Sequence, residues 1–193
     1  MNGRPTLVVI SGPAGSGKTT VAHALARRIG CPAICRDEIK EGMVHATGEF
    51  AAAAGDALTD RTFPLFFATL DLLLRSGVSV VAEAAFQDFR WRPQLTPLLD
   101  IADLRIVQCH VTATTAHGRI ERRAGEQATR RAHADSSLAD PAEHAASHDG
   151  FVRLRMDVPT IDLDTSDGYR PDLDEIVAFV NRPDPAEGGP GRA

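Results

Sequence analysis

The feature that most constrains the fold is the run GPAGSGKT at residues 12–19, which directly follows the apolar run TLVVIS. A short run of β-branched and apolar residues at 6–11 predicts a strand buried on both faces, as in a parallel sheet. Residues 18–29, KTTVAHALARRI, place apolar residues four apart, which predicts a helix with one buried stripe. A strand, a glycine-rich turn and a helix in this order predict a phosphate-binding loop.

The loop matches the pattern G-x-x-x-x-G-K-[ST] at every position. Its three glycines allow the backbone to wrap around a β-phosphate with the N–H groups pointing inward. We expect Lys18 to bridge the β- and γ-phosphates and the Thr19 hydroxyl to ligate Mg²⁺. The residues predicted to bind the nucleotide here are Gly12, Pro13, Ala14, Gly15, Ser16, Gly17, Lys18, Thr19 and Thr20.

The rest of the chain continues the alternation of strands and helices. Apolar runs predict strands at 32–36, 78–86, 104–111 and 160–166, and periodic runs predict helices at 38–46, 61–77, 90–102, 114–124 and 171–182. Five strands alternating with helices predict an α/β protein with a five-stranded parallel sheet, and together with the phosphate-binding loop they predict the three-layer α/β/α P-loop NTPase fold. We expect one domain over 1–181 and a disordered tail over 182–193, which is rich in Pro and Gly.

Composition narrows the classes of protein that the chain can represent. Of 193 residues, 43% are hydrophobic, which suits a globular protein with a core. A net charge of −5 argues against a nucleic-acid coat protein, and no stretch has the roughly 20 apolar residues of a membrane helix. Three cysteines without a zinc spacing, and no signal-peptide pattern, favour a cytoplasmic location. His144 and His148 lie four apart but lack an evident third ligand, so we expect surface positions for both.

Two acids follow predicted strands. Asp37 comes after the strand at 32–36, and Glu83 closes the buried run SVVAE. Since ligands of open α/β sheets bind at the carboxyl ends of the strands, both acids should face the cleft of the phosphate-binding loop. Asp37 could orient an acceptor hydroxyl as a base, or only cap the next helix. Glu83 could hold Mg²⁺ together with Thr19, bind the acceptor, or be a solvated acid at a helix start; Arg90 could line the acceptor pocket.

The segments GPAGSGKTT, CRDEIK, VVAEAAF, GRIERRA and RRAH resemble the small P-loop kinases that include polynucleotide 5′-kinase, zeta-toxin-type kinases and chloramphenicol phosphotransferase. The resemblance covers about residues 6–180 and implies that Asp37 deprotonates the acceptor hydroxyl. We expect Lys40 to bind the acceptor together with Asp37; it stands where the 5′-kinases have arginine, which weakens the case for a nucleic-acid acceptor. The resemblance to these kinases also implies a helical lid at about 124–140.

The resemblance further implies that lid arginines contact the transferring phosphate. Arg119 and Arg123 lie four apart on one predicted helix face, and Arg130 follows a break at Gly125. We expect Arg123 and Arg130 to stabilise charge on the γ-phosphate, Arg119 to bind the nucleotide, and Thr165 to touch the base. The alternative for these arginines is a solvated helix that is salt-bridged to neighbouring glutamates.

These observations predict a phosphotransferase that uses ATP and Mg²⁺ and phosphorylates a hydroxyl of a small molecule such as an antibiotic, a nucleoside or a sugar. Two alternatives stay open. The first is a kinase of 5′-hydroxyl polynucleotides or of nucleotide sugars, and the second is an ATP-binding switch that has no small acceptor. An acid at Asp37 favours the kinase, because a switch has little need of an acid in that cleft.

Overall fold

The computed structural model describes residues 3–47, 56–126 and 140–182. They form a parallel sheet of five strands in the order β2-β3-β1-β4-β5. The strands are β1 (Thr6–Ser11), β2 (Ala33–Cys35), β3 (Val80–Glu83), β4 (Asp103–His110) and β5 (Thr160–Asp164). The predicted α/β fold with five parallel strands is confirmed. No strand is longer than the apolar run that predicted it.

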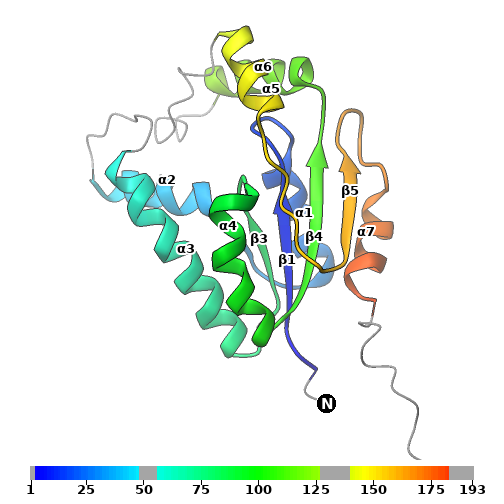
Figure 1. The fold of residues 1–193 in the computed structure, drawn as a ribbon. Coiled ribbons are helices and arrows are strands. Elements are labelled where there is room, and N and C mark those ends of the chain that lie inside the picture. The colour runs from blue at the N-terminus through cyan, green and yellow to red at the C-terminus, as the bar shows by residue number, and fades with distance from the viewer. Residues whose placement is uncertain (1–2, 48–55, 127–139, 183–193) are drawn as a thin grey trace, which may run out of the picture.

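The helices connect the strands and cover both faces of the sheet (Figure 1). They are α1 (Lys18–Ile29), α2 (Arg36–Thr47), α3 (Ala57–Arg75), α4 (Asp88–Leu95), α5 (Ala113–Glu126), α6 (Pro141–Asp149) and α7 (Leu173–Val180), with a 3₁₀ helix η1 (Thr96–Asp100) after α4. The crossovers from β1 to β2, from β2 to β3 and from β3 to β4 place helices against the two faces, whereas α5 and α6, between β4 and β5, pack on each other beyond the ends of the strands (Figure 1). The three predicted layers follow from this arrangement.

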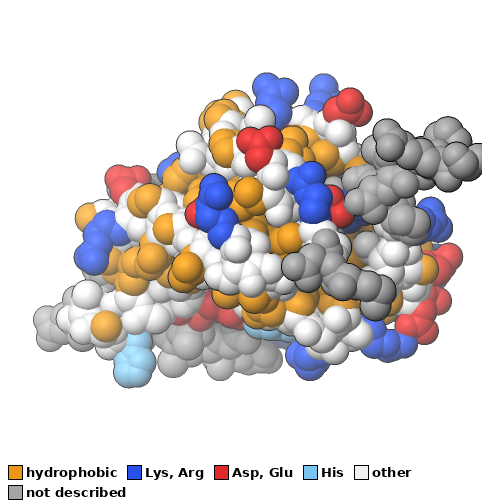
Figure 2. Space-filling model, turned by 90° about the horizontal axis from the view of Figure 1, so that it is seen from below, with side chains coloured by type: hydrophobic (Ala, Val, Ile, Leu, Met, Phe, Trp, Pro, Cys, Tyr) orange, Lys and Arg blue, Asp and Glu red, His pale blue; other side chains and the backbone are white. Residues whose placement is uncertain are grey.

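Alternating residues of β1 separate two hydrophobic clusters. Leu7 and Val9 point to the side covered by α3 and α4, where Phe66 and Trp91 are buried. Val8 and Ile10 point to the opposite side, which is covered by α1 and α7. A one-residue shift of β1 would exchange the two sets, so the buried pattern on both sides sets its register. The outer surface is mixed, with charged groups interspersed among apolar ones on the face drawn in Figure 2.

Several predicted boundaries are wrong. Helix α2 begins at Arg36 rather than at 38, and α3 begins at Ala57, one turn before the predicted start at 61, because the Asp56 side chain accepts a hydrogen bond from the Thr59 N–H and caps it. The helix expected at 90–102 divides into α4 and η1. Helix α6 was not predicted; it begins where Asp140 accepts hydrogen bonds from two backbone N–H groups.

Other predictions lie outside the described residues. Most of the expected lid, including Arg130, falls within 127–139, and most of the expected tail falls within 183–193. The single-domain prediction over 1–181 stays a prediction. Among the helices that the structure describes, none has both the length and the hydropathy required to span a membrane.

Candidate active site

The phosphate-binding loop joins β1 to α1 and packs beneath α5. Gly15 has φ of 75°, and a Cβ at that position would lie 2.5 Å from the carbonyl oxygen of Ala116. A larger residue would therefore meet both a strained backbone and α5. Lys18 donates a hydrogen bond of 2.9 Å to the carbonyl oxygen of Pro13, so its ammonium lies against the loop backbone. The loop thus places a cation and the N-terminus of α1 together, as a polyphosphate site requires.

The two residues predicted to bind the metal lie together. Thr19 donates a hydrogen bond of 3.2 Å to the carboxylate of Glu83, which is 3% exposed at the end of β3. The pKa of Glu83 is raised, mainly because the carboxylate is buried. The nearby charge of Lys18 opposes this rise, and the charge of Asp37 adds to it. A hydroxyl and a carboxylate are oxygen ligands of the kind that Mg²⁺ prefers. The pair therefore fits the metal expected from the sequence.

Asp37 lies at the same edge of the sheet, one strand beyond Glu83. It is in the first turn of α2, so the expectation that it caps a helix starting at 38 is wrong in position. Its carboxylate is about half exposed and accepts a hydrogen bond of 3.0 Å from Arg36. A negative charge in the first turn is favourable for the helix, and an exposed carboxylate can also accept a bond from a bound hydroxyl.

Arg119 and Thr165 connect α5, β5 and the phosphate-binding loop. Arg119 donates to the side-chain and backbone oxygens of Thr165 and to the carbonyl oxygen of Gly15. The Thr165 hydroxyl is buried and donates a bond of 2.8 Å to the carbonyl oxygen of Ser16. Both residues therefore brace the loop from outside its curve. Their predicted contacts with the nucleotide stay predictions.

The remaining predicted residues are placed differently. Lys40 is 4% exposed, and its ammonium forms an ion pair of 2.7 Å with Asp56, the residue that caps α3. This pair connects α2 to α3, and a role of Lys40 in substrate binding stays a prediction. Arg123 lies in α5 and is half-buried, while Arg130 lies outside the described residues.

Arg90 lies beside a cavity that sequence reasoning located only in part. The cavity has a volume of about 280 Å³, and its walls include Arg36, Thr59, Phe63, Phe89, Arg90 and Trp91. These residues come from the starts of α2, α3 and α4, close to Asp37. Arg36 and Phe63 were missed because nothing in the sequence relates their segments to α4. The chain has only one tryptophan, in the run FQDFRWR, and that was the available signal.

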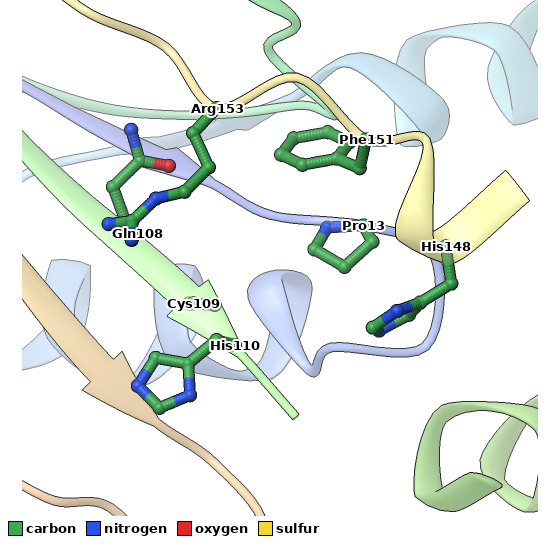
Figure 3. Close-up of a pocket in the computed structure, with 7 residues that line it drawn as sticks. All are labelled: Pro13, Gln108, Cys109, His110, His148, Phe151 and Arg153. Atoms are coloured by element: carbon green, nitrogen blue, oxygen red, sulfur yellow. The ribbon is translucent and has the colours of Figure 1, made fainter. Parts of the chain in front are cut away.

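A second cavity, of about 160 Å³, lies between the phosphate-binding loop and α6 (Figure 3). Pro13, His110, His148 and Arg153 are among the residues that line it. The expectation that His144 lies on the surface is wrong, since it is 1% exposed. Its ring centroid lies 5.3 Å from that of His117, and burial lowers the pKa of His144. Helix α6 packs on α5 through these rings.

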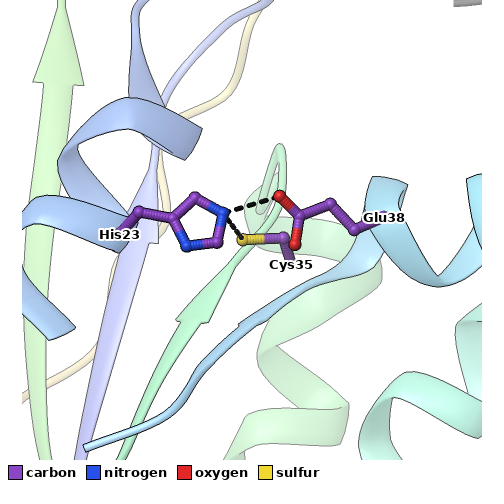
Figure 4. Close-up of side chains that lie close together, drawn as sticks. All are labelled: His23, Cys35 and Glu38. Carbon is purple, nitrogen blue, oxygen red and sulfur yellow. Dashed lines mark hydrogen bonds and ion pairs between the residues drawn. The ribbon is translucent and has the colours of Figure 1, made fainter. Parts of the chain in front are cut away.

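Three further side chains, one each from α1, β2 and α2, lie close together (Figure 4). His23 Nε2 lies 2.6 Å from a carboxylate oxygen of Glu38 and 3.7 Å from the sulfur of Cys35. The three ligand atoms lie within 4.8 Å of one another, so they could hold a thiophilic divalent cation. Sequence spacing did not indicate this group, because its members come from three separate elements.

The class of protein follows from the sheet and the loop. A central parallel strand that leads through a phosphate-binding loop into a helix, with one acid at the end of β3 and another just after β2, defines a P-loop NTPase fold. The chain belongs to the AAA domain family, whose model matches residues 7–154. Comparison with curated proteins gives no match.

Solved structures share this fold. A candidate kinase from Chloroflexus aurantiacus is 23% identical with a TM-score of 0.80, and the match covers 92% of this chain and 97% of that one. An APS kinase from Mycobacterium tuberculosis is 17% identical with a TM-score of 0.61, covering 93% and 99%. A gluconokinase from Sinorhizobium meliloti is 19% identical with a TM-score of 0.55, covering 92% and 90%. The predicted resemblance to small P-loop kinases is confirmed.

Proposed function

We propose that the protein is a phosphotransferase that moves the γ-phosphate of ATP to a hydroxyl of a small molecule. The observation that carries the proposal is the row of groups at one edge of the sheet. Lys18 and Thr19 follow β1, Glu83 ends β3, and Asp37 follows β2. Phosphoryl transfer depends mainly on positioning and on charge neutralisation, and this row supplies a cation, metal ligands and a base.

In the proposed reaction, the acceptor oxygen forms a bond to the γ-phosphorus while the bond from that phosphorus to the bridging oxygen of ADP breaks. The acceptor hydroxyl gives its proton to Asp37, and ADP leaves with the electron pair of the broken bond. Lys18 holds the β- and γ-phosphate oxygens in line with the acceptor. A bound Mg²⁺ would neutralise phosphate charge, and Thr19 with Glu83 would hold it.

The cavity beside Asp37 supports a small acceptor over a polynucleotide. Its volume of about 280 Å³ is near the lower end for small-molecule sites and suits a single sugar or a molecule of similar size. The overall charge of −5 is also unfavourable for a polyanion. Two structural relatives are named as a gluconokinase and a sugar kinase, which makes sugars and sugar acids the first acceptors to test.

The test is an acceptor screen with γ-labelled ATP on wild type, Asp37→Asn and Asp100→Asn. The screen includes sugars, sugar acids, nucleosides, antibiotics and 5′-hydroxyl oligonucleotides. Asp100 is an exposed acid in η1 and serves as the matched control. We expect one class of small acceptor to be labelled, with labelling reduced about 10²–10⁴-fold in Asp37→Asn only.

Two outcomes of this screen contradict the proposal. Labelling of oligonucleotides alone would identify a 5′-kinase. Slow ATP hydrolysis that is equal in all three proteins, with no labelled acceptor, would identify a nucleotide switch. Nucleotide binding is measured in parallel, so that a loss of phosphoryl transfer in Asp37→Asn is not mistaken for a loss of ATP binding.

A further inference from the structure

The cavity between α2, α3 and α4 adjoins the candidate base through Arg36. This arginine is the first residue of α2; its Nη1 donates to Asp37 at 3.0 Å, and its Nη2 donates to the carbonyl oxygen of Thr59 at 3.3 Å. Its guanidinium therefore spans from the base to the wall of the cavity. The side chain of Arg36 thus contacts Asp37 and also lines the cavity.

The cavity wall carries more positive than negative charge. Arg36 and Arg90 line it, and among the described residues of its wall there is no carboxylate. Asp37 balances one of the two guanidinium charges, whereas Arg90 makes no ion pair within the described residues and stacks 4.8 Å from the ring centroid of Phe63. The Nε of Arg36 is buried and has no hydrogen-bond partner in the described part of the chain. A buried donor and an unpaired guanidinium at one cavity both indicate an anionic ligand.

The other walls are aromatic. Phe63 and Trp91 pack edge to face with centroids 4.8 Å apart, and Phe89, which also lines the cavity, is 70% exposed. Large exposed aromatic side chains beside a cavity are typical of binding surfaces, since they offer apolar contact at little entropic cost. The wall of the cavity therefore combines guanidinium groups with aromatic side chains.

We infer that the phosphate acceptor is itself a compact anion, a hydroxyl compound whose carboxylate or phosphate group binds Arg36 and Arg90 while its carbon skeleton packs on Phe63 and Phe89. The inference rests on the proposed function, because it takes the cavity beside Asp37 as the acceptor site. A guanidinium matches both carboxylate and phosphate oxygens, so the two anions have to be distinguished by experiment.

Intrinsic fluorescence tests this directly, because Trp91 is the only tryptophan and lines the cavity. Wild-type protein is titrated with glucose, gluconate and glucose 6-phosphate, which share a skeleton and differ in charge. The titrations are repeated with Arg90→Gln and with Arg92→Gln. Arg92 lies on the same helix, pairs with Asp88 and is not among the residues that line the cavity, so it is the matched control.

We expect at least one anion to change the emission of Trp91 and to bind at least tenfold more tightly than glucose. Arg90→Gln should remove that preference, and Arg92→Gln should keep it. The stronger of the two anions then identifies the carboxylate or the phosphate class. Equal responses to all three sugars, no response to either anion, or an anion preference that survives Arg90→Gln would overturn the inference.

The outcome is separable from that of the proposed function. ADP formation with MgATP is followed under the same conditions for wild type and Asp37→Asn. Anion binding without acceptor-dependent ADP formation would refute the kinase and retain the anion site. Phosphoryl transfer to neutral acceptors alone would retain the kinase and refute the anionic acceptor.

Discussion

Replacing Thr165 by valine tests whether β5 holds the phosphate-binding loop in place. Valine keeps the shape of threonine and removes only the hydroxyl, which donates to the carbonyl oxygen of Ser16 at 2.8 Å and accepts from Arg119 at 3.2 Å. Thr165 is 3% exposed, so water cannot easily replace the lost group. The substitution thus removes one brace of the loop without creating a cavity.

The expected cost follows from the buried groups that are left behind. A buried polar group that loses its partner costs about 1–3 kcal/mol. Arg119 keeps its bonds to the backbone oxygens of Thr165 and Ser166, so we expect a value near the middle, about 2 kcal/mol. For a chain of this length, each kcal/mol lowers the melting temperature by about 2–4 °C, which gives a decrease of roughly 4–8 °C.

Thermal and urea unfolding measure this cost, and Thr160→Val is the control. Thr160 lies on the same strand, is exposed, and donates only to the nearby carbonyl oxygen of Val158. That variant should remain within about 0.5 kcal/mol of wild type. We also expect MgATP to raise the melting temperature of Thr165→Val less than that of wild type. Equal stability of the two variants would refute the reasoning.

Three further predictions concern a ligand, an ion pair and a titrating group. Lys18→Met should abolish the rise in melting temperature that MgATP produces, with little change in the unliganded protein. Lys40→Met leaves Asp56 without its buried cation and should lower the free energy of unfolding, measured in urea, by about 3–5 kcal/mol. Arg75→Met, which breaks an exposed ion pair with Asp71, should lower it by less than about 1 kcal/mol. Burial and the neighbouring imidazoles lower the pKa of His144 from 6.5, so the unfolded chain binds a proton at this residue more readily than the folded protein does. The free energy of unfolding should therefore be highest above pH 6.5 and decrease as the pH falls. His144→Leu should make this decrease smaller.

The elements that the sequence predicted well are those with strong local patterns. The phosphate-binding loop depends on residues adjacent in the chain, and the buried strands are uninterrupted apolar runs of the kind that a parallel sheet requires. Boundaries were less accurate where a side chain decides them. The start of α3 depends on Asp56, whose capping role is visible only once its carboxylate is seen to accept from Thr59.

Site residues were harder to predict where their partners are distant in the sequence. The sequence did not reveal the ion pair between Lys40 and Asp56, because the two residues lie sixteen positions apart in different predicted segments; the expected contact of Lys40 with substrate stays a prediction. Arg36 was overlooked because nothing in the sequence relates its segment to α4, on the other side of the cavity. The order of strands decides whether such residues reach the cleft, and short-range periodicity carries no information on that order.

Strand order also bears on the role of Asp37. In the register of the sheet, Ile10 lies beside Glu83, and Glu83 lies beside Cys35, two residues before Asp37. Neighbouring strands lie about 4.8 Å apart, so the loop after β1 and the acid after β2 are separated by roughly 10 Å, with Glu83 between them. That interval can hold a γ-phosphate and an acceptor hydroxyl, with the metal ligands alongside. With β2 directly beside β1, Asp37 would lie closer to the loop, so the insertion of β3 leaves the space that the proposed role of Asp37 as a base requires.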